Sequence, residues 1–339
     1  MNLITGGAGV TGIALANKFI TLGEKIRILD CRQPTLTDKS MEFIQGDFRD
    51  SKTVETACKN IDIVFHLGAL QPAGSGQTRL KHKKEIYYET NVIGTQNILN
   101  SAAKANVRKI VYLSSSIVYG IPETTLFYET STPSPIGEYG KSKLKAEELC
   151  LEFYAKKRLD VTILRPRTIV GSGRLGLFWI LFNWIRQNRN IYIIGSGNNR
   201  FQFVHLDDII DACILCQTKG SGEILNLGAK NVDSVYNELT KLIRYAKSNS
   251  KIIRFNPAVM KCLLKTFNLF AMSPLVEEHY LVADKTFILD TSKAEKLLGW
   301  TPKYSNLDSL IHAYDWFIQN RGKIQPEFEG ILKLIKFFS

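Results

Sequence analysis

The fold is decided at the start of the chain, where residues 2–12 read Asn2-Leu3-Ile4-Thr5-Gly6-Gly7-Ala8-Gly9-Val10-Thr11-Gly12. The apolar run at residues 2–5 predicts a short strand, and the pattern from Ile13 to Phe19 predicts a helix. The glycines between them allow a tight turn, bring backbone N–H groups close to a pyrophosphate and let the helix pack against the strand. The helix N-terminus then favours the anion. This stretch predicts a βαβ unit that binds a dinucleotide.

The next predicted strand, residues 25–29, is followed directly by Asp30. An acid at this place can accept hydrogen bonds from the hydroxyls of the adenosine ribose, which favours NAD as the cofactor. Arg32 lies two residues further on and could hold the 2′-phosphate of NADP instead. The sequence therefore predicts NAD and leaves NADP open.

A second stretch, Tyr139-Gly140-Lys141-Ser142-Lys143, offers acid/base chemistry. Residues 139–150 have a helical composition, so the Tyr139 hydroxyl and the Lys143 ammonium lie on one helix face. A nearby cation favours the phenolate and lowers a phenol pKa that starts near ~10. We expect Tyr139 to serve as a general acid/base at neutral pH.

Strand-like and helical runs alternate through the first half of the chain. The predicted strands are residues 25–30, 41–45, 62–67, 109–114 and 161–164, and the helices between them are residues 52–59, 90–104 and 139–156. Such alternation predicts an α/β fold with a doubly wound parallel sheet, whose ligands bind at the carboxyl ends of the strands. Asp30 and Ser115 both fall at such ends.

These features occur with further motifs in a fixed order. The motifs are Gly46-Asp47-Phe48-Arg49-Asp50, Val64-Phe65-His66-Leu67-Gly68-Ala69, Asn91-Val92-Ile93-Gly94-Thr95, Ser114-Ser115-Ser116-Ile117-Val118-Tyr119-Gly120, Leu164-Arg165-Pro166, Phe203-Val204-His205-Leu206-Asp207-Asp208 and Leu298-Gly299-Trp300-Thr301-Pro302. From Asn2 to about Arg321 the chain resembles the extended short-chain dehydrogenase/reductase family, which contains nucleotide-sugar epimerases and dehydratases.

The resemblance implies how the chain is divided. Residues 1–166 would form the Rossmann domain that binds NAD(P), and segments near 200–228 and 285–292 would return to it. Residues 167–322 would be mainly a smaller, substrate-binding domain. Residues 323–339 would be an amphipathic C-terminal tail, which could pack on the protein itself or lie on an anionic membrane surface.

The resemblance also implies residue roles. It places Ser115, Tyr139 and Lys143 at the catalytic positions, with Lys143 also contacting the nicotinamide ribose. The implied cofactor-binding residues are Gly6, Gly9, Val10, Thr11, Gly12, Asp30, Asp47, Phe48, Leu67, Gly68, Ala69, Asn91, Tyr139, Lys143 and Pro166. The implied substrate-binding residues are Ser115, Ser116, Arg167, Thr168 and Arg200. No metal site is expected from five dispersed histidines.

In the implied reaction, Tyr139 removes a hydroxyl proton while hydride passes from that carbon to NAD. Dehydratases of the family carry Asp-Glu after the catalytic Ser or Thr, whereas Ser116 and Ile117 stand here. We therefore expect a nucleotide-sugar epimerase, similar to UDP-sugar 4-epimerases, that turns over a transient keto intermediate.

Two departures from the family pattern concern the substrate diphosphate. Thr168 replaces an Asn that is frequent there, and Arg200 is displaced by one position from the family's diphosphate-binding Arg. The phosphates are held differently, or the substrate has none.

Two alternatives stay open. Residues 164–171, followed by Gly173-Arg174, are similar to the 3β-hydroxysteroid dehydrogenase branch, and the apolar stretches 175–184 and 257–275 would suit a lipid or sterol-like alcohol. The other alternative is a non-catalytic NAD(H)-binding regulatory protein, against which the intact set of Ser115, Tyr139 and Lys143 argues.

Composition restricts location and partners. The 339 residues are 45% apolar and 22% charged, as in an ordinary globular protein. No apolar run reaches the roughly 20 residues that span a bilayer. Because the first predicted strand begins at residue 2, we expect no signal peptide. We expect a cytoplasmic enzyme whose six cysteines are free thiols, with Cys213 and Cys216 facing the core.

The formal net charge of +12 suits an anionic small-molecule substrate. The densest basic run, residues 79–84, lacks the interleaved aromatic residues of a single-strand binding surface, so no nucleic-acid partner is expected. By resemblance we expect a homodimer formed through the helices at residues 90–104 and 139–156.

Overall fold

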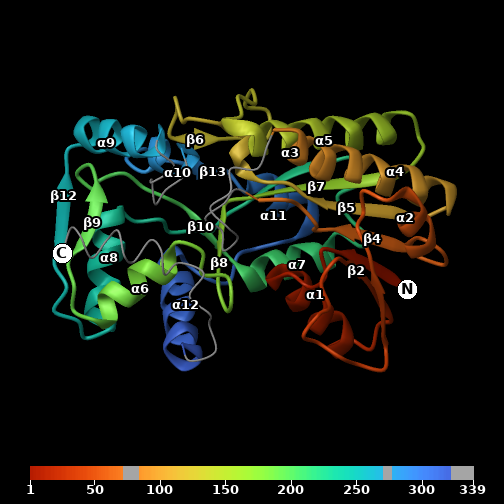
Figure 1. Ribbon diagram of the computed structural model, residues 1–339, viewed down its shortest axis with the longest axis horizontal. Helices are drawn as coiled ribbons and strands as arrows, with labels where there is room; N and C mark the ends of the chain where they lie inside the picture. The colour runs from red at the N-terminus through yellow and green to blue at the C-terminus, as the bar shows by residue number, and fades with distance from the viewer. Residues whose placement is uncertain (72–83, 270–276, 322–339) are drawn as a thin grey trace.

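The computed structural model describes residues 1–71, 84–269 and 277–321, and their centre is a parallel sheet of seven strands (Figure 1). The strand order is β11-β7-β5-β4-β1-β2-β3. The bounds are β1 (Asn2–Thr5), β2 (Ile26–Asp30), β3 (Met41–Gln45), β4 (Ile63–His66), β5 (Lys109–Leu113), β7 (Asp160–Pro166) and β11 (Ile224–Leu227). The strands β1, β4 and β5 are buried at every residue, because helices cover both faces of the sheet. The predicted doubly wound fold is confirmed.

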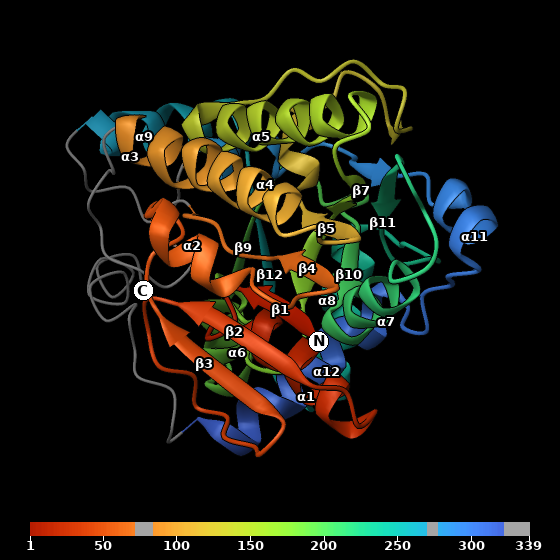
Figure 2. The same ribbon diagram turned by 90° about the vertical axis from the view of Figure 1, so that its right-hand side faces the viewer.

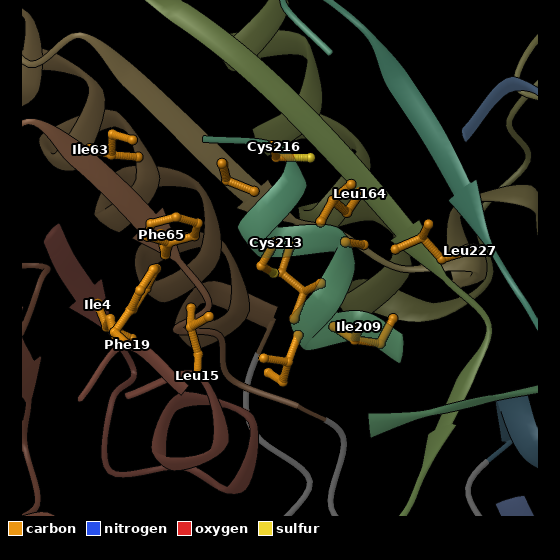
Figure 3. Packing of buried hydrophobic residues seen from close by; sticks show 14 of the residues in the cluster. Ile4, Leu15, Phe19, Ile63, Phe65, Leu164, Ile209, Cys213, Cys216 and Leu227 are labelled. Carbon is orange, nitrogen blue, oxygen red and sulfur yellow. The ribbon is translucent and has the colours of Figure 1, made fainter. Parts of the chain in front are cut away.

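Two helical layers enclose the sheet (Figure 2). The helices α1 (Val10–Thr21) and α7 (Leu206–Leu215) pack together on one face. The helices α2 (Ser51–Ala57), α4 (Gly94–Lys104) and α5 (Gly137–Ala155) cover the other. Phe19 of α1 packs on Phe65 of β4 with ring centroids 5.1 Å apart, and Cys213 and Cys216 are buried in the same cluster as free thiols (Figure 3). The predicted core position of this cysteine pair is confirmed.

The predicted strands all form, with ends that shift by one or two residues. The predicted helix at residues 90–104 is preceded by α3 (Lys84–Tyr88) and begins with a π-helical turn, η1 (Glu89–Ile93), before α4. Gly94 follows this turn, and a Cβ there would lie 2.3 Å from the Phe48 ring. The absence of a side chain at Gly94 therefore lets Phe48 pack against the start of α4.

The cap lies beyond the carboxyl end of the sheet (Figure 1). Its elements are α6 (Phe178–Arg186), β9 (Ile191–Ile194), α8 (Val235–Tyr245), β12 (Ile252–Phe255), α9 (Pro257–Leu269), α10 (Glu277–Val282) and α12 (Asn306–Asn320). Phe182 of α6 is fully buried against Tyr314 and Phe317 of α12. Residues that are far apart in the sequence thus form one apolar core for the cap.

Short strand pairs join the cap to the sheet. They are β8 (Thr168–Val170) with β10 (Phe203–His205), and β6 (Leu126–Phe127) with β13 (Ile288–Leu289). After β10 the chain returns to the main layers through α7 and the edge strand β11, which pairs with β7. The short helix α11 (Ser292–Leu298) packs beside β11. These short strand pairs and the edge strand β11 therefore connect the cap to the main sheet.

Several expectations fall outside the described residues. They are the tail at residues 323–339, the basic residues 79–83 and the end of the apolar stretch at residues 257–275. Among the helices that the structure describes, none combines the length and the apolar character needed to cross a bilayer.

Candidate active site

A cavity of about 1360 Å³ runs from the carboxyl ends of the sheet strands into the cap. Its volume exceeds the ~300–1,000 Å³ of an ordinary small-molecule pocket, so it has room for a cofactor and a substrate together. The predicted site residues that line it are Gly6, Gly9, Val10, Thr11, Gly12, Asp30, Asp47, Phe48, Leu67, Gly68, Ala69, Ser115, Ser116, Tyr139, Lys143, Pro166, Arg167 and Thr168. Asn91 and Arg200 are the two predicted residues that do not line it.

The glycine turn between β1 and α1 accommodates no side chains. Gly6 has a φ of +69°, and a Cβ there would lie 2.6 Å from Gly68 Cα. A Cβ on Gly12 would lie 2.4 Å from the Gly6 carbonyl oxygen. Gly9 caps α1 without a side-chain acceptor, so the first N–H groups of the helix can bind a phosphate. The turn fits the pyrophosphate of a dinucleotide.

Asp30 is held rigidly at the end of β2. One carboxylate oxygen accepts the Ala8 N–H at 3.0 Å, and the other accepts the Arg32 N–H at 2.9 Å. Each oxygen keeps a lone pair for a ribose hydroxyl. The Arg32 guanidinium, 64% exposed, approaches no nearer than 4.0 Å to this carboxylate. This geometry fits NAD, as the sequence predicts.

The adjacent wall contains Asp47 and Phe48. Burial raises the pKa of Asp47, but hydrogen bonds from Arg49 outweigh it and hold that pKa below its usual value. The Phe48 ring lies against Gly68, where a Cβ would come within 2.7 Å of it. Glycine at 68 thus lets the aromatic ring close this side of the cavity.

Asn91 lies behind the cavity wall rather than in it. Its Oδ1 accepts the Leu70 N–H at 2.7 Å, and its Nδ2 donates to the Leu70 carbonyl and to Ser142 Oγ. These bonds hold the loop that follows β4 against α5. Asn91 therefore holds the cavity wall in place through these bonds, and its predicted contact with the cofactor stays a prediction.

His66, at the end of β4, is buried between two threonines. Thr95 Oγ1 donates to the Asn91 carbonyl at 2.7 Å, so its oxygen must accept from His66 Nε2, 2.9 Å away. His66 Nδ1 then accepts from Thr5 Oγ1 at 2.6 Å. Burial, helped by the Lys143 charge, lowers the pKa of His66 to about 3. His66 is a neutral link between β1 and α4, and nothing in its sequence motif assigned it this role.

The three catalytic candidates meet in the cavity where β5 ends. Ser115 caps the short helix η2 (Ser116–Tyr119), with its Oγ 3.3 Å from the Ile117 N–H. Lys143 Nζ donates to the Leu113 carbonyl at 2.7 Å and lies 4.2 Å from the centre of the Tyr112 ring. Burial lowers the pKa of Lys143 to about 7. Tyr139 lines the cavity one helical turn earlier on α5.

A buried polar network supports this part of α5. Arg165 on β7 binds both carboxylate oxygens of Glu147, and its Nη1 lies 3.0 Å from the Tyr119 hydroxyl. Tyr119 in turn donates to Asn226 Oδ1 at 2.7 Å. Two of the family motifs, residues 114–120 and 164–166, therefore meet in one structural network that also includes α5, the helix of Tyr139 and Lys143.

The two arginines predicted to bind substrate have different locations. Arg167 is buried in the cavity wall, where Nη1 lies 3.4 Å from both Ser116 Oγ and Thr168 Oγ1. Arg200 is exposed and lines a separate surface hollow that also includes Gln202. A backbone bridge to Ser234 fixes this stretch. Arg200 therefore lies outside this cavity, and its contact with substrate stays a prediction.

Arg174 and Glu238 are charged wall residues that the sequence did not assign to the site. Arg174 lines the cavity and donates to Gln71 Oε1 at 3.0 Å. Glu238 on α8 is 3% exposed and lines the cap end, where burial raises its pKa. Gly173-Arg174 was a visible sequence signal for the first, but no motif marks the second.

One group in the described residues has metal-ligand chemistry. His205, Asp207 and His312 place one ligand atom each within 4.8 Å of one another. His205 Nε2 lies 2.8 Å from His312 Nδ1, and the Asp207 N–H donates to His205 Nδ1. The two rings therefore already satisfy each other through a hydrogen bond, and this geometry assigns no metal.

Comparison with known proteins places this geometry in context. Residues 2–228 match the model of the NAD dependent epimerase/dehydratase family. The uncharacterized protein y4nG of Sinorhizobium fredii is 35% identical over 324 residues, which cover 95% of this chain and 80% of y4nG.

Two solved structures are similar over nearly the whole chain. UDP-glucose 4-epimerase of Thermotoga maritima with UDP-glucose has a TM-score of 0.77 and 25% identity, covering 95% of this chain and 100% of that one. MoeE5 in complex with UDP-glucuronic acid and NAD has a TM-score of 0.74 and 26% identity, covering 94% and 99%.

Proposed function

The chain belongs to the NAD-dependent epimerase/dehydratase family, whose members are enzymes that work with NAD, and we propose that it is a nucleotide-sugar 4-epimerase. The observation that carries the proposal is the meeting of Ser115, Tyr139 and Lys143 in one cavity with the glycine turn. The similarity to a UDP-glucose 4-epimerase supports the choice of reaction.

The fit of NAD is supported by the chain's own residues. Gly6 and Gly12 leave the backbone open where the pyrophosphate would lie, and Asp30 offers lone pairs to the adenosine ribose. When bound, NAD supplies reversible acceptance of a hydride from the sugar carbon. The protein supplies positions and charges around that carbon.

Tyr139 is the proposed general base for the C4 hydroxyl and the general acid when that hydroxyl re-forms. Ser115 Oγ binds the same oxygen and orients it. The Lys143 ammonium favours the phenolate form of Tyr139. The keto sugar then turns its other face toward the cofactor, and the hydride returns to C4 on that face, which gives the C4 epimer. Substrate and product therefore have the same atoms and the same oxidation state.

The alternatives have less support. Ser116 and Ile117 offer neither the acid nor the base that a dehydratase needs for eliminating water. The named relatives do not favour a sterol-type dehydrogenase, and the intact catalytic set argues against a regulatory protein without activity. The expected homodimer, formed through α4 and α5, remains part of the proposal.

The test is to incubate the NAD-loaded enzyme with UDP-glucose and with UDP-glucuronate and to separate the products by chromatography. We expect a C4 epimer from at least one of them, formed without net gain of reduced cofactor. Steady accumulation of reduced cofactor with release of a ketone would replace the epimerase with a dehydrogenase. A C4 epimer formed equally well by Tyr139→Phe would refute the assigned acid/base.

A further inference from the structure

Arg167 is a buried cation without an acidic partner in the part of the chain that the structure describes. Its exposed fraction is 6%, and its Nη2 has no hydrogen-bond partner among the described residues. Its Nε and Nη1 make only long contacts of 3.3 to 3.4 Å with the Phe287 carbonyl and the hydroxyls of Ser116 and Thr168. Arg165, two residues earlier, instead forms an ion pair with Glu147.

An unpaired buried charge is costly, because water no longer solvates it. Burial lowers the pKa of Arg167 to about 9, which expresses the same cost. The rings of Phe201 and Phe287 lie 4.2 and 3.9 Å from the guanidinium carbon and repay part of that cost. They also fix the guanidinium in the cavity wall. A group that persists in this state is expected at a functional site.

The location of Arg167 indicates which part of a substrate it would meet. Ser116, which it contacts, directly follows Ser115, whose hydroxyl would bind the reacting oxygen at C4. In a hexopyranose, C5 is bonded to C4 and carries C6, whereas C1, with the diphosphate, lies across the ring. An anion beside Ser116 is therefore attached through C5.

We propose that Arg167, Ser116 and Thr168 form an anion subsite for a carboxylate at C6 of the sugar, so that the substrate is a nucleotide hexuronate. This inference rests on the proposed function, because it takes Ser115 to hold the C4 oxygen. The guanidinium supplies the charge and the two hydroxyls supply further hydrogen bonds. The competing assignment is that Arg167 binds the diphosphate of the substrate. Ligands with and without the carboxylate distinguish the two assignments.

The experiment measures affinities of the NAD-loaded protein for UDP, UDP-glucose and UDP-glucuronate by calorimetry. We expect Arg167→Met to lower the affinity for UDP-glucuronate about 10- to 100-fold, because this ligand alone loses a charge-assisted hydrogen bond. The affinities for UDP and UDP-glucose should not change. Arg167→Lys should retain part of the preference. Arg244→Met is the matched control, since it removes the same charge at an exposed position that does not line the cavity, and it should change none of the three affinities.

Two outcomes of the affinity measurements would overturn the subsite. An equal loss for all three ligands would place Arg167 on the diphosphate, and an unchanged affinity for UDP-glucuronate would leave it without a ligand. The melting temperature checks the fold, because removing an unpaired buried charge should raise it in the ligand-free Arg167→Met protein. A lower melting temperature would show instead that Arg167 is structural.

Free sugars separate this inference from the proposed function. We expect glucuronate, and not glucose, to raise the melting temperature of the wild-type protein and to lose this effect in Arg167→Met. If that holds while no UDP-sugar is epimerised, the subsite stands and the proposed function fails. If UDP-glucose is epimerised and the effect of glucuronate does not depend on Arg167, the function stands and the subsite fails.

Discussion

The guanidinium of Arg165 binds both carboxylate oxygens of Glu147, at 2.6 to 3.2 Å, where both side chains are almost fully buried. Glu147 lies one turn of α5 beyond Lys143, and its negative charge raises the Lys143 pKa against the effect of burial. The pair thus connects β7 to the helix that carries Tyr139 and Lys143. Breaking it leaves an uncompensated charge beside the catalytic residues.

Glu147→Gln is therefore expected to lower the free energy of unfolding by about 3–5 kcal/mol, because Arg165 loses its charged partner inside the protein. Chemical denaturation measures the change. The matched control is Glu148→Gln, which removes an exposed ion pair with Lys145 and should cost less than ~1 kcal/mol. Equal effects of the two substitutions would refute the structural role of the buried pair.

Tyr139→Phe is expected to lower kcat about 10²- to 10⁴-fold, because it removes the group that transfers the hydroxyl proton. Steady-state kinetics with a substrate that the wild-type enzyme converts would measure it. The variant should still bind NAD, because the glycine turn and Asp30 are untouched. A Tyr139→Phe enzyme with full activity would require another general base.

Asp30→Ser is expected to shift the ratio of NAD to NADP affinity about 10- to 100-fold toward NADP, because the ribose hydroxyls lose a charged acceptor. Arg32 would remain available to a 2′-phosphate. Asp38→Ser, an exposed change outside the cavity, is the control and should leave the ratio as it is. An unaltered ratio in Asp30→Ser would remove Asp30 from cofactor selection.

Burial of the Lys143 amine should make the stability of the cofactor-free protein rise with pH. Its pKa falls from 10.5 to about 7 on folding, so between these values the unfolded chain binds a proton that the native state does not. Stability attributable to Lys143 must then rise with pH across that window. Between pH 7 and pH 10.5, the stability of the wild-type protein relative to that of Lys143→Met should increase by about 3–5 kcal/mol. A stability difference between the two proteins that does not change with pH would contradict the burial of a titrating amine.

The sequence predicted the strands and the glycine turn well, because each depends on local patterns. A run such as residues 109–113 is apolar enough to be buried on both faces, and glycine is required where the Gly6 backbone meets Gly68. That Tyr139 and Lys143 face the same cavity was likewise predictable, since helical spacing alone relates them.

Contacts between distant segments account for what the sequence did not predict. Arg200 turns outward because the chain around it pairs with Ser234 and Phe287, and a displaced motif cannot reveal that direction. The side-chain amide of Asn91 is hydrogen-bonded to Leu70 and Ser142, which lie far from it in the sequence. Arg167 lies beside the rings of Phe201 and Phe287 only in the folded protein, so the sequence could not show how it is held.

Epimerisation through a keto intermediate with the help of NAD can be followed by proton NMR of the enzyme with UDP-glucuronate in deuterated water. We expect the C4 epimer to appear with its original hydrogen still at C4, because that hydrogen never exchanges with solvent. Deuterium at the inverted carbon, or inversion at any other carbon, would contradict it.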